Sequence, residues 1–569
     1  MIHINKLLRI YLSCAPNFCV NMKMKFILAG VAYSLLLIGN NAYAQTKPNV
    51  SKAVDAAMQT ASADEIKASI TYLADDKLLG RKPGEPGFQM AADYVIGQLK
   101  AYGVKPAGEN NGWTQQVRLR RTFAGKQGWA TLTVNGKTDS LKYGADIFIY
   151  PDPVHQEVSD SGELAYAGYG ITEKQLGYDD YAGLDVKGKI VVITRGAPKS
   201  FPSSDASHAM DLITLQKNAA AHGAKGVILA VSDSAARPIL ANPGRRGLYS
   251  VMDEKGVPVV SRNYYSGVSM LGMVGYKTLK QLAIAAGKNP ADFLPAIKAG
   301  KASSFAIPAN VSAGASFNYQ DVAGFNIVGK IEGSDPKLKN EYVVHSAHLD
   351  HLGVGTPIQG DSIYNGAHDN ASGVASLLQI AKIYHNLKEK PKRSILIVMV
   401  TGEELGDLGS GYFASHPTVP IKSMVADVNT DMPTIIAPLL SVTALGAEHS
   451  SLSKVVDAAA TYMGMTVEPD PEPEQNRFVR SDQYSFVLHG IPALHIKYGA
   501  RTPDGKNNLN EFVQKWRAKY YHKPQDDING IFDFDAGKKY AELNFLIGYI
   551  VANDPQRPTW NKGDIFEHN

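Results

Sequence analysis

Two hydrophobic patterns alternate along the second half of the chain. Residues 342–347, 394–400, 424–428 and 491–496 are apolar runs of strand length. Residues 371–387 instead show helical spacing, with apolar side chains at Val374, Leu377, Leu378 and Ala381. Strands that alternate with helices are typical of an α/β sheet, and the unbroken apolar run 394–400 predicts a strand covered on both faces.

The first half of the chain divides into two regions of different character. From about residue 62 to residue 117 the apolar spacing is helical, interrupted by a turn-rich loop at 80–84. From about 160 to 300, short β-like runs are interleaved with Gly, Pro and Asp. This second region includes the β-like runs 189–193 and 226–230 and an alanine-rich helix at 216–222.

The N-terminus has the pattern of a secretory signal. Lys23 and Lys25 precede the apolar run 26–38, which is too short to span a bilayer, and an Ala-Tyr-Ala cleavage pattern follows at 42–44. We therefore expect residues 1–44 to be removed after export; an uncleaved anchoring helix is the alternative. Because residues 1–21 make a poor basic flank, the start codon is expected at Met22 or Met24.

Removal of the signal changes what the composition implies. The formal net charge of +4 falls to about zero, because residues 1–44 hold four basic residues and no acidic one. No basic patch then remains to indicate nucleic acid. Cys14 and Cys19 are also lost, so the mature chain has no thiol and no lipid-bearing cysteine. We expect an exported protein, periplasmic or secreted, without a stable membrane anchor or a nucleic-acid partner.

Imidazole and carboxylate side chains follow three of the predicted strands. His348 and Asp350 follow the first strand, Glu403 and Glu404 follow the second, and Asp431 follows the third. Because α/β sheets place their sites beyond the carboxyl ends of the strands, we expect these side chains to converge. Nitrogen and oxygen ligands of this kind suit zinc and related divalent ions. The sequence therefore predicts a metal site at this edge.

Hydrolysis by two adjacent ions needs carboxylates in different roles. One must lie between the ions, and another must stay free to accept a proton from the attacking water. The neighbours Glu403 and Glu404 suit such a division into a ligand and a base. Each of these residues, taken alone, has an ordinary explanation. Asp369 could cap the following helix, and paired glutamates are most often solvated. The whole set in this order favours a metal site.

Several motifs resemble those of metallopeptidase family twenty-eight, the zinc aminopeptidases and glutamate carboxypeptidases. The motifs that carry the resemblance are residues 347–353, 365–373, 401–404, 429–431 and 521–524, together with 481–486 and 490–492. The resemblance implies the zinc-exopeptidase fold, an α/β fold in which helices flank a mixed central sheet. An N-terminal helical part at 45–155 and a di-zinc peptidase domain at 311–569 are expected to form this unit.

The region between these parts, residues 156–310, resembles a protease-associated domain. The matching segments are residues 165–170, 179–181, 188–191 and 217–226. Domains of this type are non-catalytic lids or substrate guides, so we expect an inserted β-rich domain that contributes no catalytic group.

The resemblance implies a role for each residue of the metal site. Asp369 would bridge two zinc ions, with His348 and Asp431 at one ion and Glu404 and His522 at the other. Cobalt or manganese would suit the same ligands.

The resemblance also implies the groups that act on the substrate. Glu403 would be the general base, Asp350 would orient His348, and Tyr521 would stabilise the oxyanion. His368 and Gln483 stand where the family often has an acidic residue and a histidine, which concerns substrate fit rather than catalysis.

The implied function is hydrolysis of peptides at the N-terminus, as in exported family members with such a lid. Carboxypeptidase or dipeptidase action is the alternative; it calls for arginines near the site, and Arg477, Arg480 and Arg501 are available. A one-zinc glutaminyl cyclase would keep only part of the ligand set, and an inactive binding protein would lack ligands. All five ligand positions are filled, which disfavours both.

Overall fold

The N-terminal part of the chain consists of helices that each bury one apolar stripe. The computed structural model describes residues 50–126, 128–234 and 247–567, so the expected signal segment 1–44 lies outside it. The hydroxyl of Ser62 caps α3 by accepting a hydrogen bond from the backbone N–H of Glu65 at 3.3 Å. The elements here are α2 (Lys52–Met58), α3 (Ala63–Leu73), η1 (Asp76–Arg81) and α4 (Pro86–Ala101).

The helical prediction for residues 62–117 is wrong beyond Ala101. Two strands follow, β1 (Lys105–Pro106) and β2 (Thr114–Ala124). In β2 the side chains of Val117 and Leu119 are buried whereas Arg118 between them is exposed. This period of two matches a strand, and pairing with a segment some 200 residues away outweighs the local helical signal.

The central sheet of the C-terminal part is mixed, as predicted. Strands β18, β15, β19 and β22 run parallel, whereas β14 and β20 are antiparallel to their neighbours β18 and β22. The order is β14 (Phe305–Ile331), β18 (Ser394–Val400), β15 (Tyr342–His348), β19 (Met424–Asn429), β22 (Ala493–Tyr498), β20 (Ser441–Leu445) and β21 (Thr466–Val467).

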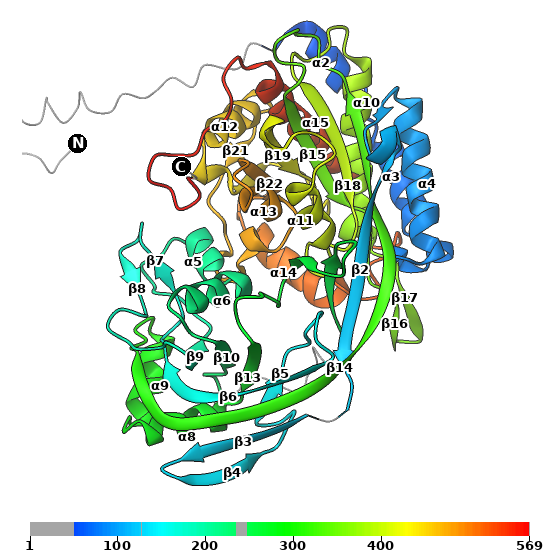
Figure 1. The fold of residues 1–569 in the computed structure, drawn as a ribbon. Coiled ribbons are helices and arrows are strands. Elements are labelled where there is room, and N and C mark those ends of the chain that lie inside the picture. The colour runs from blue at the N-terminus through cyan, green and yellow to red at the C-terminus, as the bar shows by residue number, and fades with distance from the viewer. Residues whose placement is uncertain (1–49, 127, 235–246, 568–569) are drawn as a thin grey trace, which may run out of the picture. The chain divides into compact units, whose positions relative to one another are not determined.

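Helices cover both faces of this sheet, which explains the unbroken apolar run in β18 (Figure 1). Ile395, Ile397 and Met399 face the core formed with α3, α4, α10 (Ser372–Asn386), α12 (Leu452–Tyr462) and α15 (Phe534–Asn553). The alternate residues Leu396, Val398 and Val400 face α11 (Leu408–Ser415) and α13 (Gln483–Val487).

Residues 129–317 enclose a second core around a second sheet. Its strands pair in the order β4 (Lys137–Leu141), β3 (Trp129–Val134), β14, β6 (Glu157–Tyr166), β9 (Ile190–Thr194), β10 (Gly226–Ala230), β13 (Met270–Val274) and β5 (Ile147–Ile149). Its helices are α5 (Ser203–Ala209), α6 (Leu212–Ala221), α8 (Tyr276–Ala285) and α9 (Pro290–Lys298), and the hairpin β7 (Thr172–Glu173) with β8 (Tyr178–Asp179) completes it.

The stretch 129–155 differs from the sequence-based expectation, which grouped it with the N-terminal helices. It contains β3, β4 and β5, and Ala130, Leu132 and Ile147 are buried in the second core. Because these strands are too short to form a core of their own, they find partners in β14 and β13, more than 100 residues away.

One strand spans both sheets. β14 pairs with β3 and β6 in the second sheet, then with β2, and finally with β18 in the central sheet (Figure 1). β2 also pairs with β11 (Leu248–Met252), which is followed by β12 (Pro258–Ser261). Val251 of β11 packs with Val117, Leu119 and Leu408 in one buried cluster. This cluster fixes β11 beside the loop that follows β18.

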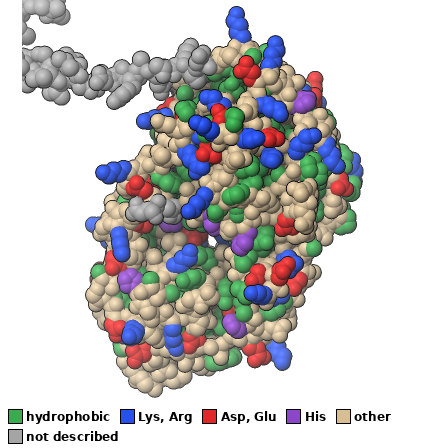
Figure 2. Space-filling model, turned by 45° about the horizontal axis from the view of Figure 1, so that its top comes forward, with side chains coloured by type: hydrophobic (Ala, Val, Ile, Leu, Met, Phe, Trp, Pro, Cys, Tyr) green, Lys and Arg blue, Asp and Glu red, His purple; other side chains and the backbone are tan. Residues whose placement is uncertain are grey.

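The surface shows no single-signed field on the face drawn in Figure 2, where basic and acidic side chains are interspersed. Within the described ranges, no helix combines the length and the apolar character needed to cross a bilayer.

Candidate active site

Three parallel strands bring His348, Glu404 and Asp431 to one edge of the central sheet. β15 ends at His348, one residue later than predicted, and pairs there with Val400, the last residue of β18. On its other side, β15 pairs with β19, which ends at Asn429, two residues before Asp431. Because the three strands run in the same direction, the loops after them begin side by side.

Asp369 lies between two groups of side chains and presents one oxygen to each. Its Oδ1 is 3.3 Å from Nε2 of His348, which is also 3.3 Å from Oδ1 of Asp431. Its Oδ2 is 3.2 Å from Nε2 of His522, which is 3.3 Å from Oε2 of Glu404. The five predicted ligands therefore converge in two groups that share one carboxylate.

Two further side chains join these groups. Oε2 of Glu403 lies 4.0 Å from Nε2 of His348, and ligand atoms of His348, Glu403 and Asp431 all lie within 4.8 Å of one another. Ligand atoms of His351, Asp369 and Glu404 likewise lie within 4.8 Å of one another. Nδ1 of His351 is 2.6 Å from Oε1 of Glu404. His351 is absent from the predicted ligand set. The only signal for it is its place in the motif 347–353.

Asp350 and Tyr521 lie near the residues that they were predicted to support. Nδ1 of His348 is 3.2 Å from the backbone carbonyl of Asp350, and the Asp350 carboxylate is 4.0 Å away. That carboxylate accepts a hydrogen bond from the backbone N–H of Glu403 at 3.2 Å. The ring of Tyr521 stacks on His522 with centroids 3.8 Å apart. Burial and the charge of Asp369 raise the pKa of Tyr521, which keeps its hydroxyl a hydrogen-bond donor.

Asp431 is held by groups that sequence reasoning missed. The hydroxyl of Ser481 donates to its Oδ2 at 2.6 Å. Its backbone carbonyl accepts from Nζ of Lys497 at 2.9 Å and from Nε2 of His495 at 2.6 Å. His495 and Lys497 are alternate residues of β22, so they share one face of the sheet. Their period-two spacing is the signal that could have identified them.

The loop that carries Asp369 is held by backbone contacts. Oδ1 of the neighbouring Asn370, just before the N-cap residue of α10, accepts from the N–H of Gly373 at 3.0 Å, so Asp369 is not needed for this contact. The carboxylate of Asp526 accepts from the backbone N–H groups of His368 and Asp369 at 3.0 and 3.1 Å. No motif in the sequence marks Asp526 for this role.

Arg81 connects the loop that follows β15 with the loop that precedes η4 (Ala367–Ala371). Its guanidinium donates to the carbonyl oxygens of Leu349 at 2.9 Å, of Asn365 at 2.6 Å and of Gly366 at 3.0 Å. A fourth bond of 2.6 Å reaches the carbonyl of Leu73. The side chain is almost fully buried although the sequence places it in a turn-rich loop.

His368 and Gln483, the two residues that differ from the family pattern, are buried. Gln483 accepts a hydrogen bond from Asn429 at 3.1 Å and donates to the carbonyl of Phe478 at 2.6 Å. His368 stacks on Phe532 and donates from Nε2 to the carbonyl of Ile531 at 3.0 Å. Both side chains thus support the fold around the site.

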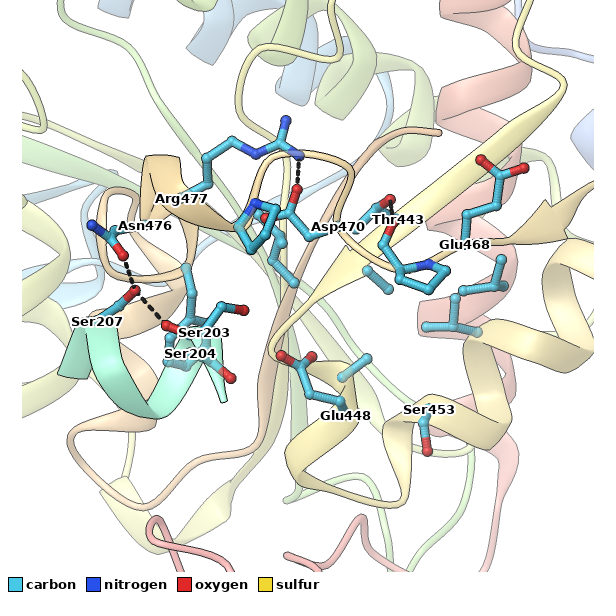
Figure 3. A pocket seen from close by; sticks show the side chains of 18 of the residues that line it. Ser203, Ser204, Ser207, Thr443, Glu448, Ser453, Glu468, Asp470, Asn476 and Arg477 are labelled. Carbon is cyan, nitrogen blue, oxygen red and sulfur yellow. Dashed lines mark hydrogen bonds and ion pairs between the residues drawn. The ribbon is translucent and has the colours of Figure 1, made fainter. Parts of the chain in front are cut away.

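Two residues from the part of the chain that contains the second sheet contact segments of the C-terminal part. Arg262, just after β12, lies with Nη2 3.7 Å from Oδ2 of Asp407 and donates to the carbonyl of Val479 at 3.2 Å. The hydroxyl of Ser207 in α5 donates to Oδ1 of Asn476 at 2.8 Å (Figure 3).

Two hollows are relevant to the site. One, of about 400 Å³, lies between α5 and the segment 467–478 and contains none of the predicted ligands (Figure 3). The other, of about 550 Å³, is lined by Glu404 and His522 and by Tyr249 of β11. We call this second hollow the active-site cleft, because it alone of the two reaches the predicted ligands.

The electrostatics of the site fit divalent cations. Burial raises the pKa of Glu403 well above its ordinary range, and Asp407 and Glu404 add to this effect while His348 opposes it. Burial and the charge of Asp369 raise the pKa of Glu404 to about 8. In the described part of the chain, Nε2 of His351 has no hydrogen-bond partner, and the 2.6 Å approach of its Nδ1 to Oε1 of Glu404 is not aligned as a hydrogen bond. Crowded buried carboxylates with converging lone pairs are what a bound cation would stabilise.

Comparisons with known families agree with this arrangement. Residues 326–544 match the family model of peptidase family M28, and residues 158–270 match that of the PA domain. The chain therefore contains a segment similar to the peptidases of family M28, preceded by a segment similar to the PA domain. Both resemblances expected from the motifs are confirmed.

Individual relatives are distant. The chain is 25% identical to the probable leucine aminopeptidase 2 of Aspergillus oryzae over 217 residues, 36% of this chain and 40% of the relative. It is 34% identical to carboxypeptidase Q of Rattus norvegicus over 120 residues, 20% of this chain and 23% of the relative. An aminopeptidase structure from Aneurinibacillus sp. strain AM-1 aligns with a TM-score of 0.46 at 18% identity, covering 88% of this chain and 96% of that chain. The matched stretches thus span less than half of each of these two curated relatives.

Proposed function

We propose that this protein is an exported di-zinc exopeptidase that removes residues from the N-terminus of peptides. The observation that carries the proposal is the position of Asp369, whose two carboxylate oxygens face two separate groups of ligands. His348 and Asp431 would hold one ion, and Glu404 and His522 the other. A carboxylate between two ions is the arrangement that two-metal hydrolysis requires.

When bound, the ions would polarise the substrate carbonyl and make the attacking water more acidic. The chain supplies the remaining steps. Glu403 accepts the proton of the water at its carboxylate and passes it to the leaving amine. Burial raises the pKa of Glu403, which helps its carboxyl to hold the proton between the two transfers. The hydroxyl of Tyr521 donates to the developing oxyanion.

The choice of the N-terminus is supported by the similarity to a leucine aminopeptidase. Carboxypeptidase or dipeptidase action is the second candidate, and the similarity to carboxypeptidase Q supports it. Two of the arginines considered for carboxylate binding are paired elsewhere. Arg477 contacts Asp470 and Glu472, and Arg501 contacts Glu468. None of Arg477, Arg480 and Arg501 lines the active-site cleft.

Metal analysis combined with a peptide assay tests the proposal. We expect two zinc ions per chain and release of N-terminal residues that a chelator abolishes and zinc restores. Two ions with cleavage of N-terminally blocked peptides would instead establish the second candidate. One ion or none would contradict the two-ion site. Export is supported by the pattern of residues 1–44, and N-terminal sequencing of the mature protein should begin at Gln45.

A further inference from the structure

The hollow between α5 and the segment 467–478 is separate from the active-site cleft. Its volume of about 400 Å³ suits a small ligand, and it shares no lining residue with the cleft. We call it the α5–α12 hollow, after the helices on its two sides. Figure 3 shows the serines of α5 on one side of it and Glu448, Ser453 and Glu468 on the other.

The wall opposite α5 combines apolar surface with carboxylates. Ser453, Val456 and Asp457 are three and four residues apart in α12, so one face of this helix borders the hollow. Glu448 comes from η6 (Ala447–His449), just before the helix. Further apolar residues of this wall are Ala444, Leu445, Val467, Pro469 and Phe478. A ligand in the hollow would therefore meet apolar surface and negative charge together.

Two of the four carboxylates in the lining are neutralised by arginines. Asp470 contacts Arg477, and Glu468 lies 3.3 Å from Nε of Arg501. Arg477 is the single lysine or arginine in the lining that the structure describes, and it also pairs with Glu472 at 3.3 Å. The lining therefore holds no further cation for the other two carboxylates.

The carboxylates of Glu448 and Asp457 have no lysine or arginine partner in the described part of the chain. That of Asp457 forms no hydrogen bond or ion pair there, and burial raises its pKa. Glu448 lies 3.7 Å from Nε2 of His449, which is charged only when protonated. A cation in the hollow would stabilise the ionised form of both carboxyl groups.

The α5 wall supplies hydroxyl groups and no counter-charge. Ser203, Ser204 and Ser207 are its lining residues. The two walls meet where the hydroxyl of Ser207 donates to Oδ1 of Asn476 at 2.8 Å (Figure 3). A ligand that complements this hollow must therefore bring the positive charge itself.

We propose that the α5–α12 hollow binds a small primary amine with an apolar chain. The ammonium group lies against Asp457 and Glu448, and the chain lies against Val456 and the other apolar residues of the wall. An ammonium group has three N–H donors, and its hydrogen bonds to carboxylates are stronger than those between neutral groups. The inference does not depend on the proposed peptidase function, because none of the predicted metal ligands lines the hollow.

Calorimetric titration of the mature, zinc-loaded protein tests the site with three probes of similar shape. They are isoamylamine, isoamyl alcohol and isovalerate, which carry a positive, a neutral and a negative head group. We expect the amine to have a Kd at least about tenfold lower than that of the alcohol, the difference typical of a charged hydrogen bond. Isovalerate should not bind, and salt should weaken the binding of the amine.

Substitutions then locate the amine. Asp457→Asn should raise its Kd about tenfold. Glu448→Gln should act in the same direction but more weakly, because the Glu448 side chain is half exposed, and it is an independent variant if Asp457→Asn folds poorly. Glu474→Gln is the matched control, since Glu474 is an exposed residue of η7 (Pro473–Gln475) that does not line the hollow. Peptide hydrolysis by all three variants should match the wild type, which separates the hollow from the active-site cleft.

Three results would overturn the inference. The first is the absence of measurable amine binding, and the second is an equal Kd for the amine and the alcohol, which would make the hollow a site for neutral apolar molecules. The third is a Kd that Asp457→Asn and Glu448→Gln leave unchanged, which would place the amine elsewhere in the protein. Loss of the proposed peptidase function with amine binding intact would contradict that function alone.

Discussion

The guanidinium of Arg262 lies 3.7 Å from the carboxylate of Asp407, which follows Glu403 by four residues. Arg262 lies in the segment that matches the PA domain, whereas Asp407 is the N-cap residue of α11 in the segment that matches family M28. Asp407 is buried, and the charge of its carboxylate contributes to the raised pKa of Glu403. The PA domain thus supplies a counter-charge to the loop that carries the predicted base.

Removal of this counter-charge should lower the turnover rate. We expect Arg262→Gln to reduce kcat by about tenfold, equivalent to about 1.4 kcal/mol, because Asp407 would be left buried without a cation near Glu403. Adding Asp407→Asn to that variant should restore part of the loss, which steady-state kinetics of the two single variants and the double variant would measure. Independent, additive effects of the two substitutions would contradict the coupling.

Glu403 should be needed for chemistry but dispensable for metal binding. We expect Glu403→Gln to lower kcat by a factor of about 10²–10⁴, the range typical of a general base, while the zinc content stays unchanged. Elemental analysis and peptide kinetics on the same preparation would check both. His522→Ala is the contrasting variant and should lose metal as well as activity. Retained turnover in Glu403→Gln would remove Glu403 from its assigned role.

Arg81 should contribute strongly to stability. Arg81→Met would leave four buried carbonyl oxygens without their donor, so we expect the free energy of unfolding to fall by about 3 kcal/mol or more. Denaturant unfolding monitored by circular dichroism would measure the change. Lys77→Met, in the same short helix, removes an exposed pair with Asp75 and a cation–π contact with Tyr72, so it should change stability far less. Similar losses in the two variants would contradict the assignment.

Asp180 in the PA domain should make stability depend on pH. Burial raises the pKa of its carboxyl from an ordinary value of 3.8 to about 6, although the N–H groups of Tyr169 and Ile171 donate to it. The folded state therefore holds this proton more tightly than the unfolded state. The stability that Asp180 contributes is complete below about pH 4 and is lost as the pH rises through about 6.

Asp180→Asn should remove this dependence. In the wild type, the free energy of unfolding should fall by at most about 3 kcal/mol between pH 4 and pH 7 because of Asp180. We expect a smaller fall in the variant. Thermal or denaturant unfolding across this range would measure it. Asp185→Asn is the control, because Asp185 is exposed and its pKa is lowered by the N–H of Lys187, which places its effect below this window. An unchanged slope in Asp180→Asn would contradict the assignment.

The sequence by itself determined the central sheet and the order of the predicted site residues. The apolar run 394–400 is long enough for one strand and has no polar face, so it requires helices on both sides, as the structure shows. Polar residues just after such strands must lie at the sheet edge, because a buried parallel strand can expose side chains only at its ends. His348 and Glu403 could be placed at the same edge for this reason.

The tertiary structure decided the features that depend on contacts between distant segments. Local spacing could not show that β2 is a strand, because its partner β14 lies about 200 residues further along the chain. Nor could it show that Arg81 is buried under two loops, or that Arg121 faces the cleft while Arg118 faces Glu254. Sequence periodicity specifies which side chains share a face. What that face contacts is set by packing between segments that have no relation in sequence.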